Sequence, residues 1–340
     1  MAENKNFTIG ITQGDLNGIG YEVIIKSLSD NRIMELCTPV VYGLAKVASY
    51  HKKYMDLPDF SFQYTKTAEQ LSNKRPNLIN LYEEEVKVDL GTSTRIAGQM
   101  AERALYAAGR DLKNNLIDAI VTAPVNKNNI QSEKFKFPGH TSFFEHYFGG
   151  KEHPALMMMV AEKLRIGFAT NYLPIKDVAA NITTETVLQK LEILNRSLKQ
   201  DFALNAPTIA VLSLNPHGGE EGLLGNEDKD TVQPAVAQAF HNGINAFGPF
   251  PADGFFSSGA FAKFDAILAM YYDQGMVPFK LLGKNGVNFT AGLPIVRTAP
   301  AHGTAYDIAG QGRASVDATW QAFRIACRMG LSHRAARAAA

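Results

Sequence analysis

Short apolar, β-branched runs alternate with longer stretches of helical periodicity along almost the whole chain of 340 residues. Residues 7–12 and 39–42 have the composition of buried strands, and apolar residues at helical spacing follow each of them. Residues 116–125 are the most apolar of these runs, which predicts a central strand. This alternation is typical of a mostly parallel sheet with crossover helices, so the sequence predicts the α/β class.

Residues 155–170 depart from this alternation. Two apolar runs, MMMV and RIGFAT, flank a short polar segment, which predicts a β-hairpin. Such a β insertion suits a second subdomain, and at roughly 150 residues per domain the chain is long enough for two.

Charge and composition exclude several classes of function. Lys and Arg number 34 against 33 Asp and Glu, so no bulk field attracts nucleic acid or an anionic membrane. No apolar run approaches the ~18 residues that span a bilayer, and no secretory signal opens the sequence. Cys37 and Cys327 are the only cysteines and have no CxxC spacing, which argues against a disulfide framework. We therefore expect a cytoplasmic protein with neither nucleic-acid nor membrane partners.

Polar segments follow two of the expected strands. Residues 215–219 (NPHGG) come after the strand expected at 208–214, and residues 272–275 (YDQG) after the one expected at 266–271. In open α/β sheets, ligands bind beyond the carboxyl ends of strands, so both segments are candidate site elements. His217 has room there to reach a ligand or metal. A plain turn, with His217 bonded to the backbone, explains the same residues equally well.

Two further segments could hold an anion. The glycine-rich residues 14–20 lie between an expected strand and helix, a position that favours anions, although a structural tight turn is at least as good an interpretation. They fit neither the dinucleotide fingerprint nor the P-loop. His140 and Thr141 lie in an expected loop and could both donate hydrogen bonds to one phosphate. A lone histidine on a loop is more often a solvated surface residue.

Near the C-terminus, a polar group stands out from an apolar, glycine-rich stretch. Lys280, Asn288 and Arg297 precede a His302-Gly303-Thr304 turn. Two cations, one with the planar fork of arginine, suit a phosphate or carboxylate.

Nine segments, taken in order, resemble those of the 4-hydroxythreonine-4-phosphate dehydrogenase family of the pyridoxine phosphate pathway, and together they cover nearly the whole chain. They are GITQGDLNGIG, VTAPVNK, FPGHTSFFE, NYLPIKDV, SLNPHGGEEG, GPFPADGFF, AMYYDQG, NFTAGLPIVRT and AHGTAYDIAG. The run HGTAYDIAG is also similar to the HGSAPDIAG of isocitrate and isopropylmalate dehydrogenases.

The resemblance implies a two-domain, non-Rossmann fold of the isocitrate/isopropylmalate dehydrogenase type, with a cleft between the domains. Residues 1–130 and 298–340 would form the first, discontinuous domain, and residues 131–297 the second, with the dimer interface. The family is a homodimer with sites at the subunit interface.

The implied activity is NAD-dependent oxidation of 4-phosphohydroxy-L-threonine to 2-amino-3-oxo-4-phosphooxybutyrate, in vitamin B6 biosynthesis. That β-keto acid then loses carbon dioxide and becomes 3-amino-2-oxopropyl phosphate. One alternative is a dehydrogenase for another phosphorylated hydroxy acid, such as phosphothreonate or phosphoerythronate. Another is a catalytically silent homologue that still binds a phosphorylated ligand.

The resemblance also implies roles for individual residues. His140, Thr141, Lys280, Asn288 and Arg297 match substrate-binding positions of the family. The nucleotide-side loop is matched by four residues: His302, Gly303, Thr304 and Asp307. The general base is left open among three candidates, Asp253, Asp273 and Lys127. For the two aspartates, a turn-capping role is an equally good interpretation.

The family's divalent metal (Zn²⁺, Mg²⁺ or Mn²⁺) is held by three histidines, of which this chain keeps one. His217 matches the second ligand, whereas Tyr172 and Tyr272 stand at the first and third, the third being contributed across the dimer. A phenol with a pKa near 10 must lose its proton before it becomes a good ligand, whereas neutral imidazole is ready at pH 7. The sequence therefore predicts severely weakened metal binding.

Overall fold

The computed structural model describes residues 7–55, 57–150 and 152–339. The chain divides into two compact units: unit 1 comprises residues up to 148 and from 295 onward, and unit 2 comprises residues 149–294. The boundaries expected from the family resemblance lie at 130/131 and 297/298. Strands and helices alternate in both units, which confirms the α/β class.

The sheet of unit 1 is entirely parallel. Its strands follow the order β3 (Gln63–Thr65), β4 (Asn77–Asn80), β2 (Thr38–Gly43), β1 (Thr8–Thr12), β5 (Ala119–Thr122) and β12 (Val296–Pro300). β1, β2, β5 and β12 are buried at every position, as expected of parallel strands covered on both faces. The polar residues that end these strands therefore gather at one edge of the sheet.

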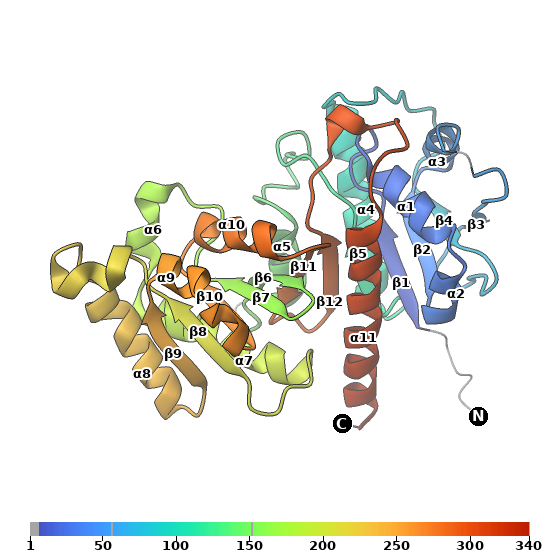
Figure 1. Ribbon diagram of the computed structural model, residues 1–340. Helices are drawn as coiled ribbons and strands as arrows, with labels where there is room; N and C mark the ends of the chain where they lie inside the picture. Colours follow the sequence, from blue (N-terminus) through green and yellow to red (C-terminus); the bar gives the residue numbers. More distant parts are fainter. Residues whose placement is uncertain (1–6, 56, 151, 340) are drawn as a thin grey trace. The chain divides into compact units, whose positions relative to one another are not determined.

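The two longest helices of unit 1 pack on its strands (Figure 1). The helices of this unit follow in chain order. They are α1 (Gly20–Leu28), α2 (Arg32–Leu36), α3 (Ala45–Lys52), α4 (Arg95–Lys113), α5 (His140–Phe144) and α11 (Asp317–Ala339), with the short turn η5 at Tyr306–Ile308. A π-helical turn, η1 (Glu145–Gly149), follows α5. α4 begins where the Thr94 hydroxyl accepts a hydrogen bond from the amide of Ala97, and it buries small residues against β1, β2 and β5.

The sheet of unit 2 is mixed. Its strands follow the order β11 (Val287–Ala291), β6 (Leu156–Ala161), β7 (Leu164–Phe168), β10 (Ala266–Ala269), β8 (Thr208–Leu212) and β9 (Asn245–Phe250). β6 pairs antiparallel with both β7 and β11, and the remaining pairs are parallel. The antiparallel β6–β7 pair confirms the hairpin predicted at residues 155–170.

The helices and turns of unit 2 follow its strands. They are α6 (Ile175–Asn181), α7 (Thr184–Gln200), α8 (Gln233–His241), α9 (Ala252–Ser257) and α10 (Tyr272–Leu282), with η2 (Pro216–Gly222), η3 (Asp228–Val232) and η4 (Ala260–Lys263). α7 packs on β6, β7 and β11, and the Thr183 hydroxyl caps its first turn. None of the helices in the described ranges is long and apolar enough to cross a membrane.

The structure corrects the expectation of a loop at residues 138–141, because α5 begins at His140. Phe143 and Phe144 are fully buried, and this burial stabilises the short helix. A helix of five residues is too short to show helical periodicity in the sequence. The expected strand at 116–125 is also shorter, since β5 covers only Ala119–Thr122.

Cys37 and Cys327, far apart in the sequence, lie close together in unit 1. Both are buried and free. A hydrogen bond with Cys327, and then burial, raises the pKa of the Cys37 thiol. The pair therefore belongs to the core of unit 1 as two thiols.

Candidate functional site

Unit 1 contains a basic cluster made of Arg297, His140 and Lys127. Arg297 lies on β12 and is 1% exposed, although arginine is rarely buried. Its Nε and Nη2 donate to the Thr122 hydroxyl at 3.2 and 2.6 Å, and its guanidinium carbon lies 5.9 Å from the ring centroid of Phe144. Since Thr122 ends the neighbouring strand β5, these contacts hold the guanidinium at the carboxyl edge of the sheet.

His140, the first residue of α5, carries a neutral imidazole. Its Nε2 is shielded from solvent and makes no hydrogen bond to any residue the structure describes. Burial first, and then the charges of Arg297 and Lys127, hold the pKa of His140 well below its usual range. A buried polar nitrogen beside two cations is the environment expected for part of an anion-binding site.

Lys127 and Thr141 complete this neighbourhood. The end of the Lys127 side chain approaches Gly139, where an added Cβ would lie 3.7 Å from the lysine Cε. Partial burial of the ammonium lowers the pKa of Lys127. Thr141 is 8% exposed and directly follows His140. The cluster thus runs from an exposed lysine to a fully buried arginine, and its charge favours a phosphate or carboxylate.

The glycine-rich turn at residues 14–20 is tied to the loop that follows β12. Gly18 lies so close to that loop that a Cβ on it would be 2.6 Å from the carbonyl oxygen of Thr304, which only glycine permits. The amide of Ile19 donates to the same carbonyl at 3.0 Å. The turn therefore holds the backbone at Thr304, within the expected nucleotide-side loop.

Asp15 is the centre of this connection. It is 1% exposed, and its Oδ2 accepts hydrogen bonds from the Tyr306 hydroxyl and from Asn129 Nδ2, each at 2.7 Å. Burial of the phenol, and then its hydrogen bond to the Asp15 carboxylate, raise the pKa of Tyr306 to about 12. The Tyr306 hydroxyl therefore remains a donor. Asp15, Asn129 and Tyr306 are not among the site residues expected from the sequence. An acidic residue within a glycine-rich turn between buried elements was the available signal.

The four residues expected on the nucleotide side differ in exposure. Gly303 and Asp307 are exposed, whereas His302 and Thr304 are half-buried. His302 Nδ1 lies 3.1 Å from the carbonyl oxygen of Gly303. Asp307 is the second residue of η5.

In unit 2, Tyr172 and Tyr272 pack against each other. Their ring centroids are 5.5 Å apart with an interplanar angle of 36°, and Tyr272 also stacks on Phe168 at 5.8 Å. The two tyrosines follow β7 and β10, whose ends are joined because the Thr170 hydroxyl donates to the Met270 carbonyl at 2.7 Å. These positions, which are 100 residues apart, are therefore neighbours within a single chain.

His217 belongs to a loop with unusual backbone geometry. Residues 217–221 all have positive φ, and Asp228, buried beneath them, accepts hydrogen bonds from the amides of Leu214 and Asn215 at 2.6 and 2.8 Å. The His217 side chain is 66% exposed, and its Nδ1 lies 3.0 Å from Glu220 Oε2. The loop thus presents an exposed imidazole held by a carboxylate.

The residues present do not fit a three-histidine metal centre. Two of the three positions are phenols. The pKa of Tyr272 is raised above its usual range, first by burial of the phenol and then by the neighbouring Tyr172 and Asp273. Both conditions disfavour the phenolate form that would bind a metal at neutral pH. Within the described ranges, no group of three or more His, Cys, Asp or Glu side chains is arranged to hold a metal ion.

The remaining predicted residues are spread over unit 2. Lys280 lies near the end of α10, where partial burial lowers the pKa of its ammonium, and Asn288 is half-buried on β11. Asp253 and Asp273 are exposed in the first turns of α9 and α10, where carboxylates favourably meet helix dipoles. In the described part of the chain, neither helix shows a side-chain hydrogen bond at its N-cap, so the two aspartates are placed at helix starts without a capping contact.

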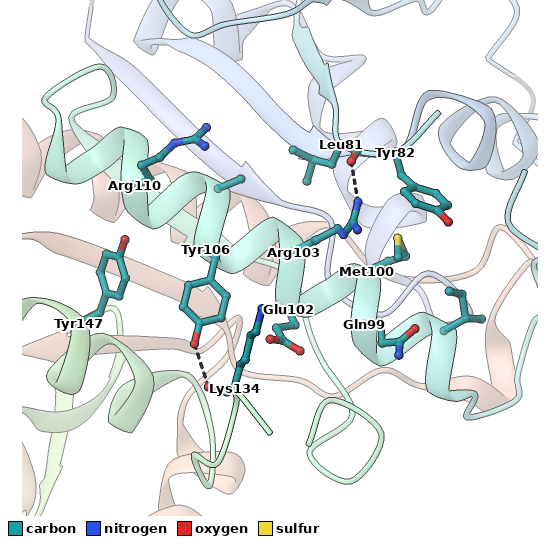
Figure 2. Close-up of a pocket in the computed structure, with 12 residues that line it drawn as sticks. Leu81, Tyr82, Gln99, Met100, Glu102, Arg103, Tyr106, Arg110, Lys134 and Tyr147 are labelled. Carbon is teal, nitrogen blue, oxygen red and sulfur yellow. Dashed lines mark hydrogen bonds between the residues drawn. The ribbon is translucent and has the colours of Figure 1, made fainter. Parts of the chain in front are cut away.

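A separate cavity of about 820 Å³ lies along α4 in unit 1 (Figure 2). The Tyr106 hydroxyl donates to the Lys134 carbonyl at 2.9 Å, and Arg103 Nη1 donates to the Leu81 carbonyl at 3.3 Å. Its lining residues are Leu81, Tyr82, Ile96, Gln99, Met100, Glu102, Arg103, Tyr106, Ala107, Arg110, Lys134 and Tyr147. None of the residues predicted from the sequence lines this cavity, so it carries no part of the predicted chemistry.

The parallel strands of unit 1 thus carry a basic cluster at their carboxyl ends, which is where α/β proteins commonly place a ligand site. A family model described as "Pyridoxal phosphate biosynthetic protein PdxA" matches residues 35–326. The chain belongs to this family.

Similar proteins of known name cover nearly the whole chain. A 4-hydroxythreonine-4-phosphate dehydrogenase from Bacteroides thetaiotaomicron is 50% identical over 327 residues, which is 96% of this chain and 89% of the relative. A D-threonate 4-phosphate dehydrogenase from Cupriavidus necator is 36% identical over 320 residues, with 93% and 95% covered. The crystal structure of a 4-hydroxythreonine-4-phosphate dehydrogenase from Klebsiella pneumoniae aligns with a TM-score of 0.81 at 31% identity, covering 97% of this chain and 99% of that one.

Proposed function

We propose that this protein is an NAD-dependent dehydrogenase that oxidises 4-phosphohydroxy-L-threonine in the biosynthesis of pyridoxine 5'-phosphate. The observation that carries the proposal is the basic cluster of Arg297, His140 and Lys127, present in a PdxA-family chain that is 50% identical to a dehydrogenase named for this substrate. In this cluster Arg297 supplies the positive charge that a phosphorylated substrate needs, and His140 is a neutral hydrogen-bonding neighbour.

The proposed reaction has two steps. In the first, the hydrogen on C3 leaves as hydride to NAD⁺ while the C3 hydroxyl loses its proton, which gives the β-keto acid and NADH. In the second, the bond between C2 and the carboxylate breaks and carbon dioxide leaves. The electron pair remains on C2, which takes up a proton, and the product is 3-amino-2-oxopropyl phosphate.

Residues of unit 1 are assigned by their surroundings. Arg297 binds the phosphate through its planar donor array, with His140 and Thr141 as hydrogen-bond partners. Lys127 is the general base of this proposal, because its lowered pKa brings the neutral amine closer to neutral pH. The exposed Asp253 and Asp273 are assigned to helix starts instead.

The other assignments follow the family positions. Residues 302–307 hold the nucleotide, whose nicotinamide accepts the hydride. In unit 2, Lys280 and Asn288 bind polar groups of the substrate. The ammonium of Lys280 suits the substrate carboxylate, and the side-chain amide of Asn288 can donate or accept a hydrogen bond. The protein acts as a homodimer, since the family's site lies at a subunit interface.

The test measures NADH formation with two substrates side by side, 4-phosphohydroxy-L-threonine and D-threonate 4-phosphate. We expect the first to give the higher kcat/KM, with release of one carbon dioxide per NADH. A higher kcat/KM for D-threonate 4-phosphate would replace the proposed substrate. Binding of either compound without any NADH would indicate a silent binding protein.

A further inference from the structure

Tyr172 and Tyr272 occupy, in this chain, the positions at which its family resemblance places two imidazole ligands of a divalent metal. The two phenol rings lie 5.5 Å apart, and Phe168 extends the stack. Phenols therefore stand at both of these positions, and within one chain the two phenols pack against each other.

The surrounding backbone holds this pair rigidly. The ends of β7 and β10 are joined by the amide of Ala169, which donates to the Ala269 carbonyl at 2.8 Å. Gln274, two residues after Tyr272, accepts from the Met270 amide at 2.7 Å and donates to the Ser213 carbonyl at 2.6 Å. Tyr172 itself has a φ of 47°, a conformation that non-glycine residues rarely adopt. Such strain persists where the fold requires a side chain in one fixed direction.

The chemistry of the pair suits hydrogen bonding rather than metal binding. A phenol keeps its proton at neutral pH and is then an O–H donor. Tyrosine hydroxyls are among the donors that stabilise developing negative charge on a substrate oxygen. In the proposed reaction such charge appears on the C3 oxygen, first as the carbonyl forms and again as the carboxylate leaves.

We propose that this protein binds its substrate without a resident divalent metal, and that the hydroxyls of Tyr172 and Tyr272 donate hydrogen bonds to the substrate oxygens in place of the metal. The second part of this inference rests on the proposed function, whereas the first part does not. His217 remains as a single imidazole, held by Glu220 on the surface. One imidazole alone does not make a divalent metal site.

The first experiment measures metal content. Protein purified without chelator is analysed by mass spectrometry for Zn, Mg and Mn, and Zn²⁺ is then titrated into it by calorimetry. We expect far less than one metal per chain and no saturable site. The double variant Tyr172→His/Tyr272→His should gain a Zn²⁺ site. Its matched control is Tyr172→His/Tyr64→His, which adds the same number of imidazoles but places one on the exposed Tyr64, and it should gain none.

The second experiment removes the hydroxyls and keeps the rings. In Tyr172→Phe and Tyr272→Phe we expect kcat to fall about 100-fold, the range seen when one donor to an oxyanion is lost. The thermal midpoint should stay unchanged, because the ring packing is preserved. Activity of the unaltered protein should persist in EDTA.

Different results overturn different parts. Near-stoichiometric metal, or activity lost in EDTA and restored by Zn²⁺, Mg²⁺ or Mn²⁺, would overturn the metal-free site. Unchanged kcat in both phenylalanine variants would overturn the donor role. If the unaltered protein forms no NADH, the proposed function fails; metal content still decides the first part, and calorimetric binding of 4-phosphohydroxy-L-threonine to the phenylalanine variants decides the second.

Discussion

At the scale of single residues, the basic cluster shows how burial changes what a side chain can do. Arg297 is fully buried yet keeps its guanidinium at a strand end through the Thr122 hydroxyl. The same charge, together with burial, keeps His140 neutral. A neutral imidazole beside a cation can both accept and donate, so the site adapts to the hydrogen-bonding needs of a phosphate.

Replacing Arg297 by alanine should weaken binding of a phosphorylated ligand by about 1.5 to 3 kcal/mol, because a charge-assisted hydrogen bond is lost. Isothermal titration of 4-phosphohydroxy-L-threonine measures the change. Arg103→Ala, on the outer face of α4, is the control and should bind like the unaltered protein. Since a buried side chain is removed, the circular dichroism spectrum of Arg297→Ala must match that of the unaltered protein. Equal affinity in a folded variant would contradict the phosphate role.

The lowered pKa of His140 predicts a stability that depends on pH. The unfolded chain takes up a proton near the ordinary pKa of 6.5, whereas the folded chain resists protonation. The free energy of unfolding of the ligand-free protein should therefore decrease as the pH falls below about 6.5, by at most about 1.4 kcal/mol per pH unit for this group. The buried His51 adds to the same trend, since burial lowers its pKa as well.

Urea unfolding at several pH values between neutral and mildly acidic checks this dependence. His140→Gln should flatten the curve, and His153→Gln, which changes an exposed histidine, should leave it as it is. An equally steep curve in His140→Gln would show that His140 is not the group responsible.

At the scale of secondary-structure elements, α4 positions the loop that carries Lys127 and Asn129. Gly98 lies on the buried face of this helix, where a Cβ would meet the carbonyl oxygen of Asn129 at a distance that no atom pair tolerates. The helix can approach the loop only because this side chain is missing, and Asn129 in turn reaches Asp15.

Gly98→Ala should therefore destabilise the protein by about 1 to 3 kcal/mol through overpacking. Gly109→Ala, in the same helix, is the matched control: its Cβ would lie 3.4 Å from the nearest atom, on the Tyr147 ring. Without a clash, the helix propensity of alanine should make this variant neutral or more stable by up to about 1 kcal/mol. Thermal unfolding of both variants gives the comparison, and equal midpoints would contradict the close approach.

At the scale of the whole molecule, each unit has its own strands and its own set of predicted residues. The basic cluster and the nucleotide-side loop belong to unit 1, whereas the tyrosine pair, His217, Lys280 and Asn288 belong to unit 2. Tyr172 and Tyr272 are adjacent within one chain, whereas the expectation that residue 272 faces a partner subunit comes from the family resemblance alone.

We expect sedimentation analysis to give a homodimer of two 37.1 kDa chains. The Tyr172→Phe and Tyr272→Phe variants should sediment in the same way, because they retain the aromatic packing. A monomer that is fully active at all concentrations would contradict a site completed by a second subunit.

The sequence by itself determined the α/β class, the hairpin at residues 155–170, the main buried strands and the polar segments at their ends. These features depend on local periodicity and on residue type, and both can be determined from the sequence without a structure. The family motifs also identified Arg297, His140 and the two tyrosines as positions of interest.

Only the tertiary structure decided which of these residues are neighbours. Contacts such as those of Arg297 with Thr122, or of Asp15 with Tyr306, join residues 175 and 291 positions apart, and no local pattern encodes such a distance. Burial likewise comes from the whole fold, so the neutral state of His140 and the raised pKa of Tyr272 could not be read from their segments. Chain composition sets which groups are available, and packing sets which of them meet and in what charge state.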